Sequence, residues 1–145
     1  MKNMKKTLIL IITIFLAIAM VLGYNIYYRN IAIAEASKNN KTYESFYNQP
    51  VLGTDIISVI NKAIDSNEKN LVEKDEEGNY IDNEENSIKI DIKFKELDQI
   101  ISMERIEKIG MQQFWKNFGS FNFQCTKIEY HEKTNNVKYM YFEQI

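Results

Sequence analysis

An uncharged apolar run near the N-terminus constrains this chain more than any other feature. It extends from Thr7 to Gly23, and its only polar residues are two threonines. Continued through Tyr28, it provides about 20 residues, enough for a helix with a rise of about 1.5 Å per residue to cross about 30 Å of hydrocarbon. The tyrosines at its end suit a membrane interface, because each carries an apolar ring with a polar hydroxyl. The sequence therefore predicts a membrane protein with one N-terminal transmembrane helix.

The charges that flank this run predict its orientation. Lys2, Lys5 and Lys6 precede it, whereas Arg29 alone follows it directly. The cytoplasmic flanks of transmembrane helices carry the excess of lysine and arginine. We therefore expect a single-pass protein of the cell membrane, with a cytoplasmic N-terminus and an extracellular C-terminal domain. The many Ile, Lys and Asn residues and the single proline are typical of an AT-rich genome, and we expect a Gram-positive bacterium as the source.

Two alternatives compete with the anchor. One is a cleaved signal peptide, because Val21, Gly23, Ala34 and Ala36 offer small residues before a cleavage site. The apolar run is longer than the core of roughly 7 to 15 residues that signal peptides have, which favours retention. The other alternative is a buried core helix. The leader contains no cysteine, so attachment of a lipid at a lipobox is excluded.

The rest of the 145-residue chain has room for one small domain. Residues 30–49 contain neither glycine nor proline, so the spanning helix is expected to continue as a stem until Pro50 ends it. The pair Asn39-Asn40 offers an earlier end. We divide the chain into a cytoplasmic tip and transmembrane anchor at 1–29, a helical stem at 30–50 and an extracytoplasmic domain at 51–145.

Two amphipathic helices are expected in this domain. The first begins at Gly53-Thr54 and ends at Asn67 or Asn70, with its apolar residues on one face. Ser102 is expected to cap the second. Gly110 lies at the middle of this second helix, where we expect it to permit close packing of the helix on a sheet.

The strands are predicted from alternation and from aromatic content. Between Ser87 and Lys95, apolar residues alternate strictly with charged residues, which is the period of a strand with one face in water. Residues 121–145 indicate two aromatic strands joined by a turn at 133–136. The apolar register changes within the first of them, and a bulge near Cys125 explains the change. The predicted fold class is α+β, with a small antiparallel sheet packed with two amphipathic helices.

Composition excludes several classes of function. The chain has 18 basic and 20 acidic side chains and a net charge of −2, which argues against a nucleic-acid partner. Its single cysteine and single histidine exclude an intrachain disulfide and an all-cysteine zinc site. It contains no glycine loop of the phosphate-binding type and no zinc-binding helix motif. We assign no catalytic, cofactor-binding or metal-binding residue, and we expect no cofactor and no enzymatic activity.

Cys125 and His131 are the only residues that suggest a nucleophile with its base. A thiol nucleophile needs the activating base within hydrogen-bonding distance, and six residues along one strand correspond to about 20 Å. We therefore expect Cys125 to be a buried core thiol and His131 to be a solvated surface side chain.

The polar run from Glu73 to Asn86 offers oxygen ligands of the kind that calcium prefers, although their spacing is not that of an EF-hand. A solvated, mobile loop is the simpler interpretation, because like charges repel and remain hydrated. A short hairpin is expected around Glu77-Gly78. The candidate calcium ligands are Asp75, Glu77, Asn79, Asp82 and Glu84.

The last two strands contain more aromatic residues than one core face needs. We expect most of them to be core residues. Alternatively, those on the second face form an exposed aromatic surface for envelope protein partners, or close a groove under the polar run. The residues concerned are Phe121, Phe123, Tyr130, Tyr139, Tyr141 and Phe142.

The order of Lys5-Lys6, a spanning helix, a helical stem and a small α+β head resembles the architecture of type IV pilins and pseudopilins. The resemblance implies an N-terminal helix that sits in the membrane and packs into a filament. Pilins typically have a processing glycine just before the apolar segment and a glutamate five residues into the mature helix, and neither precedes Gly23 here. No pilin site is therefore carried over. The run from Cys125 to His131 is also similar to stretches in uncharacterised small membrane proteins of Gram-positive bacteria.

Three hypotheses about function follow. The first is a non-enzymatic, membrane-anchored component of a surface or secretion assembly, of pseudopilin-like kind. The second is an extracytoplasmic ligand-binding or sensing module, motivated by the acidic run and the surplus aromatic residues. The third, a secreted enzyme, depends on Cys125. The identity of any small-molecule ligand is not indicated by the sequence.

The predicted topology can be tested with protease added to intact, wall-stripped cells. Because the lysines precede the apolar run, we expect digestion of the C-terminal domain and retention of an N-terminal fragment in the membrane. Immunoblotting for tags at both termini would measure this. A domain that is protected until the membrane is opened would contradict the orientation, and a mature chain that begins after Gly23 would turn the anchor into a signal peptide.

Overall fold

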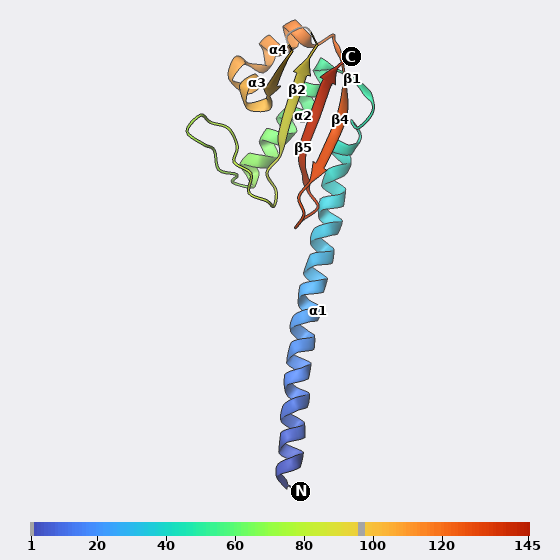
Figure 1. Cartoon of the computed structure of the whole chain (residues 1–145), viewed down its shortest axis with the longest axis vertical. Coiled ribbons are helices and arrows are strands. Elements are labelled where there is room, and N and C mark those ends of the chain that lie inside the picture. The colour runs from blue at the N-terminus through green and yellow to red at the C-terminus, as the bar shows by residue number, and fades with distance from the viewer. Residues whose placement is uncertain (1, 96–97) are drawn as a thin grey trace. The chain divides into compact units, whose positions relative to one another are not determined.

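The computed structural model describes residues 2–95 and 98–145 (Figure 1). They form two compact units, one that reaches Glu35 and one, the head, that comprises Ala36–Ile145. Helix α1 (Lys2–Glu44) supplies the whole first unit and the first residues of the head. Within the first unit the large apolar side chains from Met4 to Tyr28 are all exposed. Helix α1 is long and apolar enough to cross a membrane, as predicted, and a signal sequence has the same properties.

The head is an α+β domain built on one open, five-stranded sheet, which confirms the predicted fold class. The strand order is β1-β4-β5-β2-β3, and every pair is antiparallel except β2 with β5, which is parallel. A parallel pair needs a long connection, and the chain between β2 and β5 contains β3, two helices and β4. The elements after α1 are β1 (Pro50–Leu52), α2 (Gly53–Lys69), β2 (Lys89–Phe94), β3 (Gln99–Ser102), α3 (Met103–Ile109), α4 (Met111–Phe118), β4 (Asn122–Tyr130) and β5 (Val137–Gln144).

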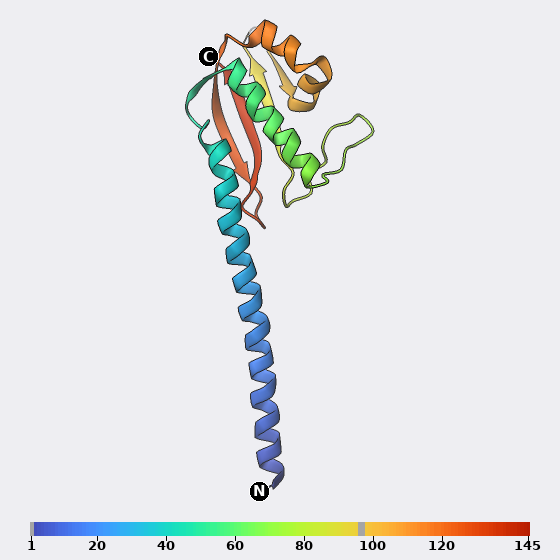
Figure 2. The same cartoon turned by 180° about the vertical axis from the view of Figure 1, so that it is seen from behind.

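Alternation along the strands separates a core face from an exposed face. On β2, the predicted apolar residues Ile90, Ile92 and Phe94 are buried against the helices, together with Met140 and Phe142 of β5. Helix α2 crosses this face of the sheet (Figure 2). The opposite face, here called the open face, carries charged and tyrosine side chains. They include Lys89, Asp91 and Lys93 of β2, Lys127 and Glu129 of β4, and Tyr139 and Tyr141 of β5.

The predicted second helix is two helices. Ser102 does cap the first of them, because its hydroxyl oxygen accepts a hydrogen bond from Arg105 N at 3.4 Å. Gly110 then interrupts the helix with a φ of 102°, in the region that glycine enters without strain. The expectation of close packing at Gly110 was wrong, since a Cβ there would meet nothing within 4 Å.

The close approach occurs instead at Gly53, where α2 begins. A Cβ on this residue would lie 2.1 Å from the carbonyl oxygen of Phe118, at the end of α4. The backbone N–H of Gly53 also donates to Phe121 O at 3.0 Å. The start of α2 therefore packs directly against the end of α4, and only glycine at position 53 permits this close approach.

The C-terminal hairpin agrees with the sequence prediction. Strands β4 and β5 are joined by residues 131–136, and their register shifts between Cys125 and Lys127, at the predicted bulge. The two short edge strands, β1 and β3, were not predicted. Each has only three or four residues, too few to show an alternating pattern.

Two buried asparagines hydrogen-bond to the beginnings of strands, and we call them the asparagine clasps. Helix α1 ends at Glu44, six residues before Pro50, and is not broken at Asn39-Asn40. The Asn40 side chain instead accepts from Val137 N at 2.9 Å and donates to Asn135 O at 2.7 Å. In the same way Asn67 accepts from Ile88 N and donates to Ile88 O, both at 2.8 Å.

Replacing Asn40 by alanine should destabilise the head, because it leaves Val137 N and Asn135 O without their partner. An unpaired buried group costs about 1 to 3 kcal/mol, and we expect Asn40→Ala to lower the free energy of unfolding by roughly that amount. The neighbouring Asn39 is exposed, so Asn39→Ala is a matched control with little expected effect. Urea unfolding of the full chain in detergent, followed by near-UV circular dichroism, measures the free energy of unfolding of both variants. An equal loss of stability in Asn40→Ala and Asn39→Ala would contradict the role of the Asn40 clasp.

Candidate functional site

The acidic run between β2 and α2 is divided into two separately folded parts. In the first, the Asp75 carboxylate accepts hydrogen bonds from Asn79 N at 2.8 Å and from Asn79 Nδ2 at 3.1 Å. These bonds hold the pKa of Asp75 below its usual value. Lys74 pairs with Tyr80 as an antiparallel bridge, in agreement with the predicted short hairpin. Within the described residues, no three His, Cys, Asp or Glu side chains are grouped so that they would hold a metal ion.

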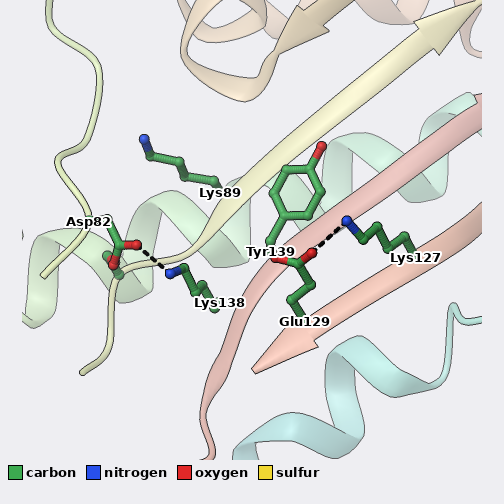
Figure 3. A pocket seen from close by; sticks show the side chains of 7 residues that line it. Asp82, Lys89, Lys127, Glu129, Lys138 and Tyr139 are labelled. Carbon is green, nitrogen blue, oxygen red and sulfur yellow. Dashed lines mark hydrogen bonds and ion pairs between the residues drawn. The ribbon is translucent and has the colours of Figure 1, made fainter. Parts of the chain in front are cut away.

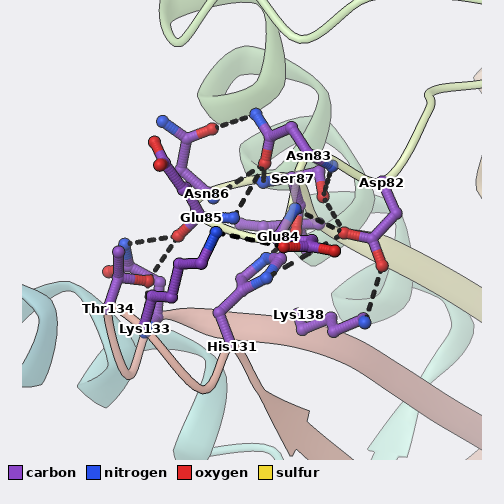
Figure 4. A network of polar contacts seen from close by, with 12 residues as sticks. Asp82, Asn83, Glu84, Glu85, Asn86, Ser87, His131, Lys133, Thr134 and Lys138 are labelled. Carbon is purple, nitrogen blue, oxygen red and sulfur yellow. Dashed lines mark hydrogen bonds and ion pairs between the residues drawn. The ribbon is translucent and has the colours of Figure 1, made fainter.

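The second part, residues 82–87, is organised around the carboxylate of Asp82. One of its oxygens accepts from Glu84 N at 2.9 Å and from the Ser87 hydroxyl at 3.1 Å. The other lies 2.6 Å from Lys138 Nζ, at the start of β5 (Figure 4). The hydrogen bond from Lys138 is the main reason that the pKa of Asp82 is lowered to about 2. Asp82 therefore remains ionised at any physiological pH.

Residues 82–87 are also attached to the turn between β4 and β5. Lys133 Nζ lies 3.1 Å from a carboxylate oxygen of Glu84. The carbonyl oxygen of Glu85 accepts from the Thr134 hydroxyl and, at 3.2 Å, from Asn136 Nδ2. We call this set of contacts between residues 82–87 and 131–138 the loop clamp (Figure 4). Residues 82–85 are exposed, as expected for a solvated loop, and these contacts also tie the loop to the turn between β4 and β5.

His131 is part of the loop clamp and is not the predicted surface side chain. It is only 3% exposed, and its Nε2 lies 2.7 Å from Ser87 O. Because a carbonyl oxygen only accepts, Nε2 carries the hydrogen. Its Nδ1 lies 4.0 Å from Asp82 Oδ1. Both of these partners, Ser87 and Asp82, are more than 40 positions away in the sequence, and nothing next to His131 indicates them.

Cys125 and His131 do not form a nucleophile and base pair. The thiol of Cys125 is fully buried, as predicted, and donates to Lys127 O at 3.5 Å. Burial raises the pKa of this thiol, which disfavours the reactive thiolate. The ring of His131 has a different partner, the carbonyl of Ser87.

The aromatic residues of the last two strands are divided between core and surface. Phe123 and Phe142 are completely buried. Tyr139 and Tyr141 lie on the open face, half-buried, with their ring planes 22° apart and their centroids separated by 6.5 Å. Most of the six were expected in the core. Tyr139 and Tyr141 lie on the second face of the strands, where the sequence alternative placed the aromatic residues that are not in the core.

A pocket of about 290 Å³ lies on the open face, above β2, β5 and β4 and beside the loop clamp (Figure 3). Tyr139 stands at its centre, and its hydroxyl donates to Asp91 Oδ2 at 3.0 Å. A groove that aromatic residues close under the polar run was one of the sequence alternatives, and Tyr139 and Asp82 do line this pocket. The sequence did not predict that lysines of three strands would join them. The residues that line the pocket are Asp82, Ser87, Lys89, Lys127, Glu129, Lys138 and Tyr139.

Comparison of the chain with protein-family models, with curated proteins and with solved structures finds no match. No residue of the pocket or of the loop clamp is therefore assigned a role by similarity. The chemistry of both follows from their own side chains.

Replacing Asp82 by asparagine should weaken the loop clamp in a pH-dependent way. A carboxyl with a lowered pKa stabilises the folded state above its ordinary pKa of 3.8, and this stabilisation is lost as the pH falls towards about 2. At pH 7 we expect Asp82→Asn to lower the free energy of unfolding by about 1 kcal/mol. The difference in free energy of unfolding between Asp82→Asn and the wild type should become smaller as the pH falls from 4 to 2.

Urea unfolding at a series of pH values measures this difference, and Glu84→Gln is the control. Glu84 and its partner Lys133 are both largely exposed, so this variant should change the stability by less than about 0.5 kcal/mol. An effect of Asp82→Asn that is independent of pH, or an equal effect of Glu84→Gln, would contradict the role of the ionised carboxylate.

Proposed function

We propose that the chain is a non-enzymatic, membrane-anchored extracytoplasmic protein and a component of a surface or secretion assembly, of pseudopilin-like kind. The observation that carries this proposal is the unburied apolar surface of α1, which extends from Met4 to Tyr28. Exposed apolar surfaces of this extent mark membrane or protein contacts. A hydrocarbon environment satisfies such a surface, and neighbouring helices in the same membrane do so equally well.

The way in which the head begins supports retention of the helix. Ala36, Asn40 and Tyr43 recur at the spacing of one helix face and are buried in the head. Asn40 also bonds the start of β5. The same helix thus supplies the apolar segment and part of the head, which favours an anchor over a peptide that is removed.

The non-enzymatic character is supported by the two residues that most suggested catalysis. Cys125 is a core thiol with a raised pKa, and the His131 ring donates to a backbone carbonyl inside the loop clamp. Both side chains stabilise the fold. The orientation with the head outside rests on the lysines that precede the apolar run.

The pocket on the open face favours a second function, extracytoplasmic ligand binding. It is a concave site with one aromatic ring, and its charged side chains can orient a polar ligand. A calcium ligand is not favoured, because the carboxylates of Asp75 and Asp82 bond separate parts of the chain.

Photo-crosslinking tests the assembly. A photoreactive side chain placed singly at each position from Ile9 to Leu22 of the full chain should give membrane adducts at every third or fourth position, because one helix face contacts a neighbour. Gel shifts and mass spectrometry identify whether the neighbour is another copy or an envelope protein. The positions between the reactive ones are internal controls. If no position gives an adduct, the chain is a monomer in the membrane and the assembly proposal fails.

A further inference from the structure

The pocket of Figure 3 has one more positive than negative charge. Lys138 is bonded to Asp82 at 2.6 Å, and Lys127 is bonded to Glu129 at 2.5 Å. Lys89 also lines the pocket, yet it has no hydrogen bond or ion pair in the part of the chain that the structure describes. The other two ammonium groups are neutralised within the pocket, whereas the charge of Lys89 acts on the Asp91 carboxyl without forming an ion pair. The Lys89 ammonium is therefore the one that can form an ion pair with an anion.

The centre of the pocket is a fixed aromatic ring. The Tyr139 hydroxyl donates to Asp91, so the ring is held in one orientation. Burial and the nearby Asp91 carboxylate raise the pKa of Tyr139, and the phenol stays neutral. Lys127 Nζ lies 5.8 Å from the ring centroid. A ligand therefore meets an aromatic surface that already has one ammonium group over it.

Lys89 and Tyr139 are neighbours in the lining of the pocket. Lys89 and Tyr139 are directly paired in the register of the parallel strands β2 and β5. Adjacent strands lie about 4.8 Å apart, so the two side chains start from neighbouring positions, and the Lys89 ammonium extends away from the ring (Figure 3). A volume of about 290 Å³ is at the lower limit of small-molecule pockets and corresponds to a ligand with one ring.

The surrounding carboxylates limit the charge of that ligand. Asp82 and Glu129 both line the pocket, and a dianion would meet repulsion from both. A neighbouring hollow of about 510 Å³ also includes Lys89, but it is lined by the carboxyl groups of Asp75, Asp91 and Glu104. A monoanion matches the single excess charge and is excluded from the neighbouring hollow.

We propose that this pocket binds a single-ring carboxylate, with its carboxylate group on Lys89 and its ring against Tyr139. The inference concerns the open face only and holds whether the head acts alone or in an assembly. An absence of photo-crosslinked adducts would contradict the assembly and leave this ligand proposal unaffected.

The test is a ligand-observed NMR titration of the full chain in nanodiscs with sodium benzoate, compared with sodium acetate. Because an exposed ion pair contributes little, we expect a Kd on the order of 1 mM for benzoate. Acetate, which has no ring, should bind several times more weakly. Inorganic phosphate at pH 8, mostly a dianion, should bind more weakly than benzoate.

Variants separate this site from general attraction to lysines. Lys89→Gln should raise the Kd for benzoate about threefold or more, and Lys93→Gln should leave it unchanged. Lys93 is the matched control, because it lies on the same strand and face as Lys89 and outside the pocket. Tyr139→Leu removes the ring and should abolish the preference for benzoate over acetate.

Three results would overturn the proposal. They are the absence of saturable benzoate binding, equal affinities for benzoate and acetate, and equal effects of Lys89→Gln and Lys93→Gln. Near-UV circular dichroism verifies that each variant is folded. If Tyr139→Leu does not fold, the pair of lysine variants still decides the result, because both lysines are on the surface of the sheet.

Discussion

Backbone groups at the beginning of a buried strand need partners, and in this head side chains from distant segments supply them. The asparagine clasps bond Ile88 and Val137, where β2 and β5 begin, and His131 bonds the carbonyl of Ser87. Leaving such groups unpaired would cost about 1 to 3 kcal/mol each. The parallel pair at the centre of the sheet therefore has its register fixed at one end. Lys89 and Tyr139 follow these bonded residues by one and two positions, so the same contacts position the pocket.

Local sequence patterns were sufficient to predict much of the fold. The alternation in Ser87–Lys95 predicted which side chains of β2 face the core, because a strand has only two faces. The Ser102 cap, the C-terminal hairpin and the bulge after Cys125 were also predicted correctly, since each depends on a few neighbouring residues. Gly110 was expected to lie within one helix and to permit close packing, whereas its conformation ends α3 and begins α4.

The features that sequence reasoning missed depend on partners far along the chain. Asn39-Asn40 was considered as an earlier end of the stem helix, and Asn67 or Asn70 as the end of α2, because short amide side chains compete with the local backbone. Asn70 is indeed the C-cap of α2. Asn40 and Asn67 instead bond strands 97 and 21 residues away. Contacts with residues far along the chain also explain the burial of His131, the pairing of β2 with β5 and the set of residues that lines the pocket. None of them leaves a periodic pattern in the residues concerned.

The position of β5 in the sheet has a consequence for the order in which this protein matures. Strand β5 lies between β4 and β2, and it is synthesised after the other four strands. Until it emerges, β1 and β4 on one side and β2 and β3 on the other have no common partner. The apolar segment of α1 emerges first. The head therefore completes its sheet only after β5 has been synthesised, and until then the edges of β4 and β2 that face β5 stay unpaired.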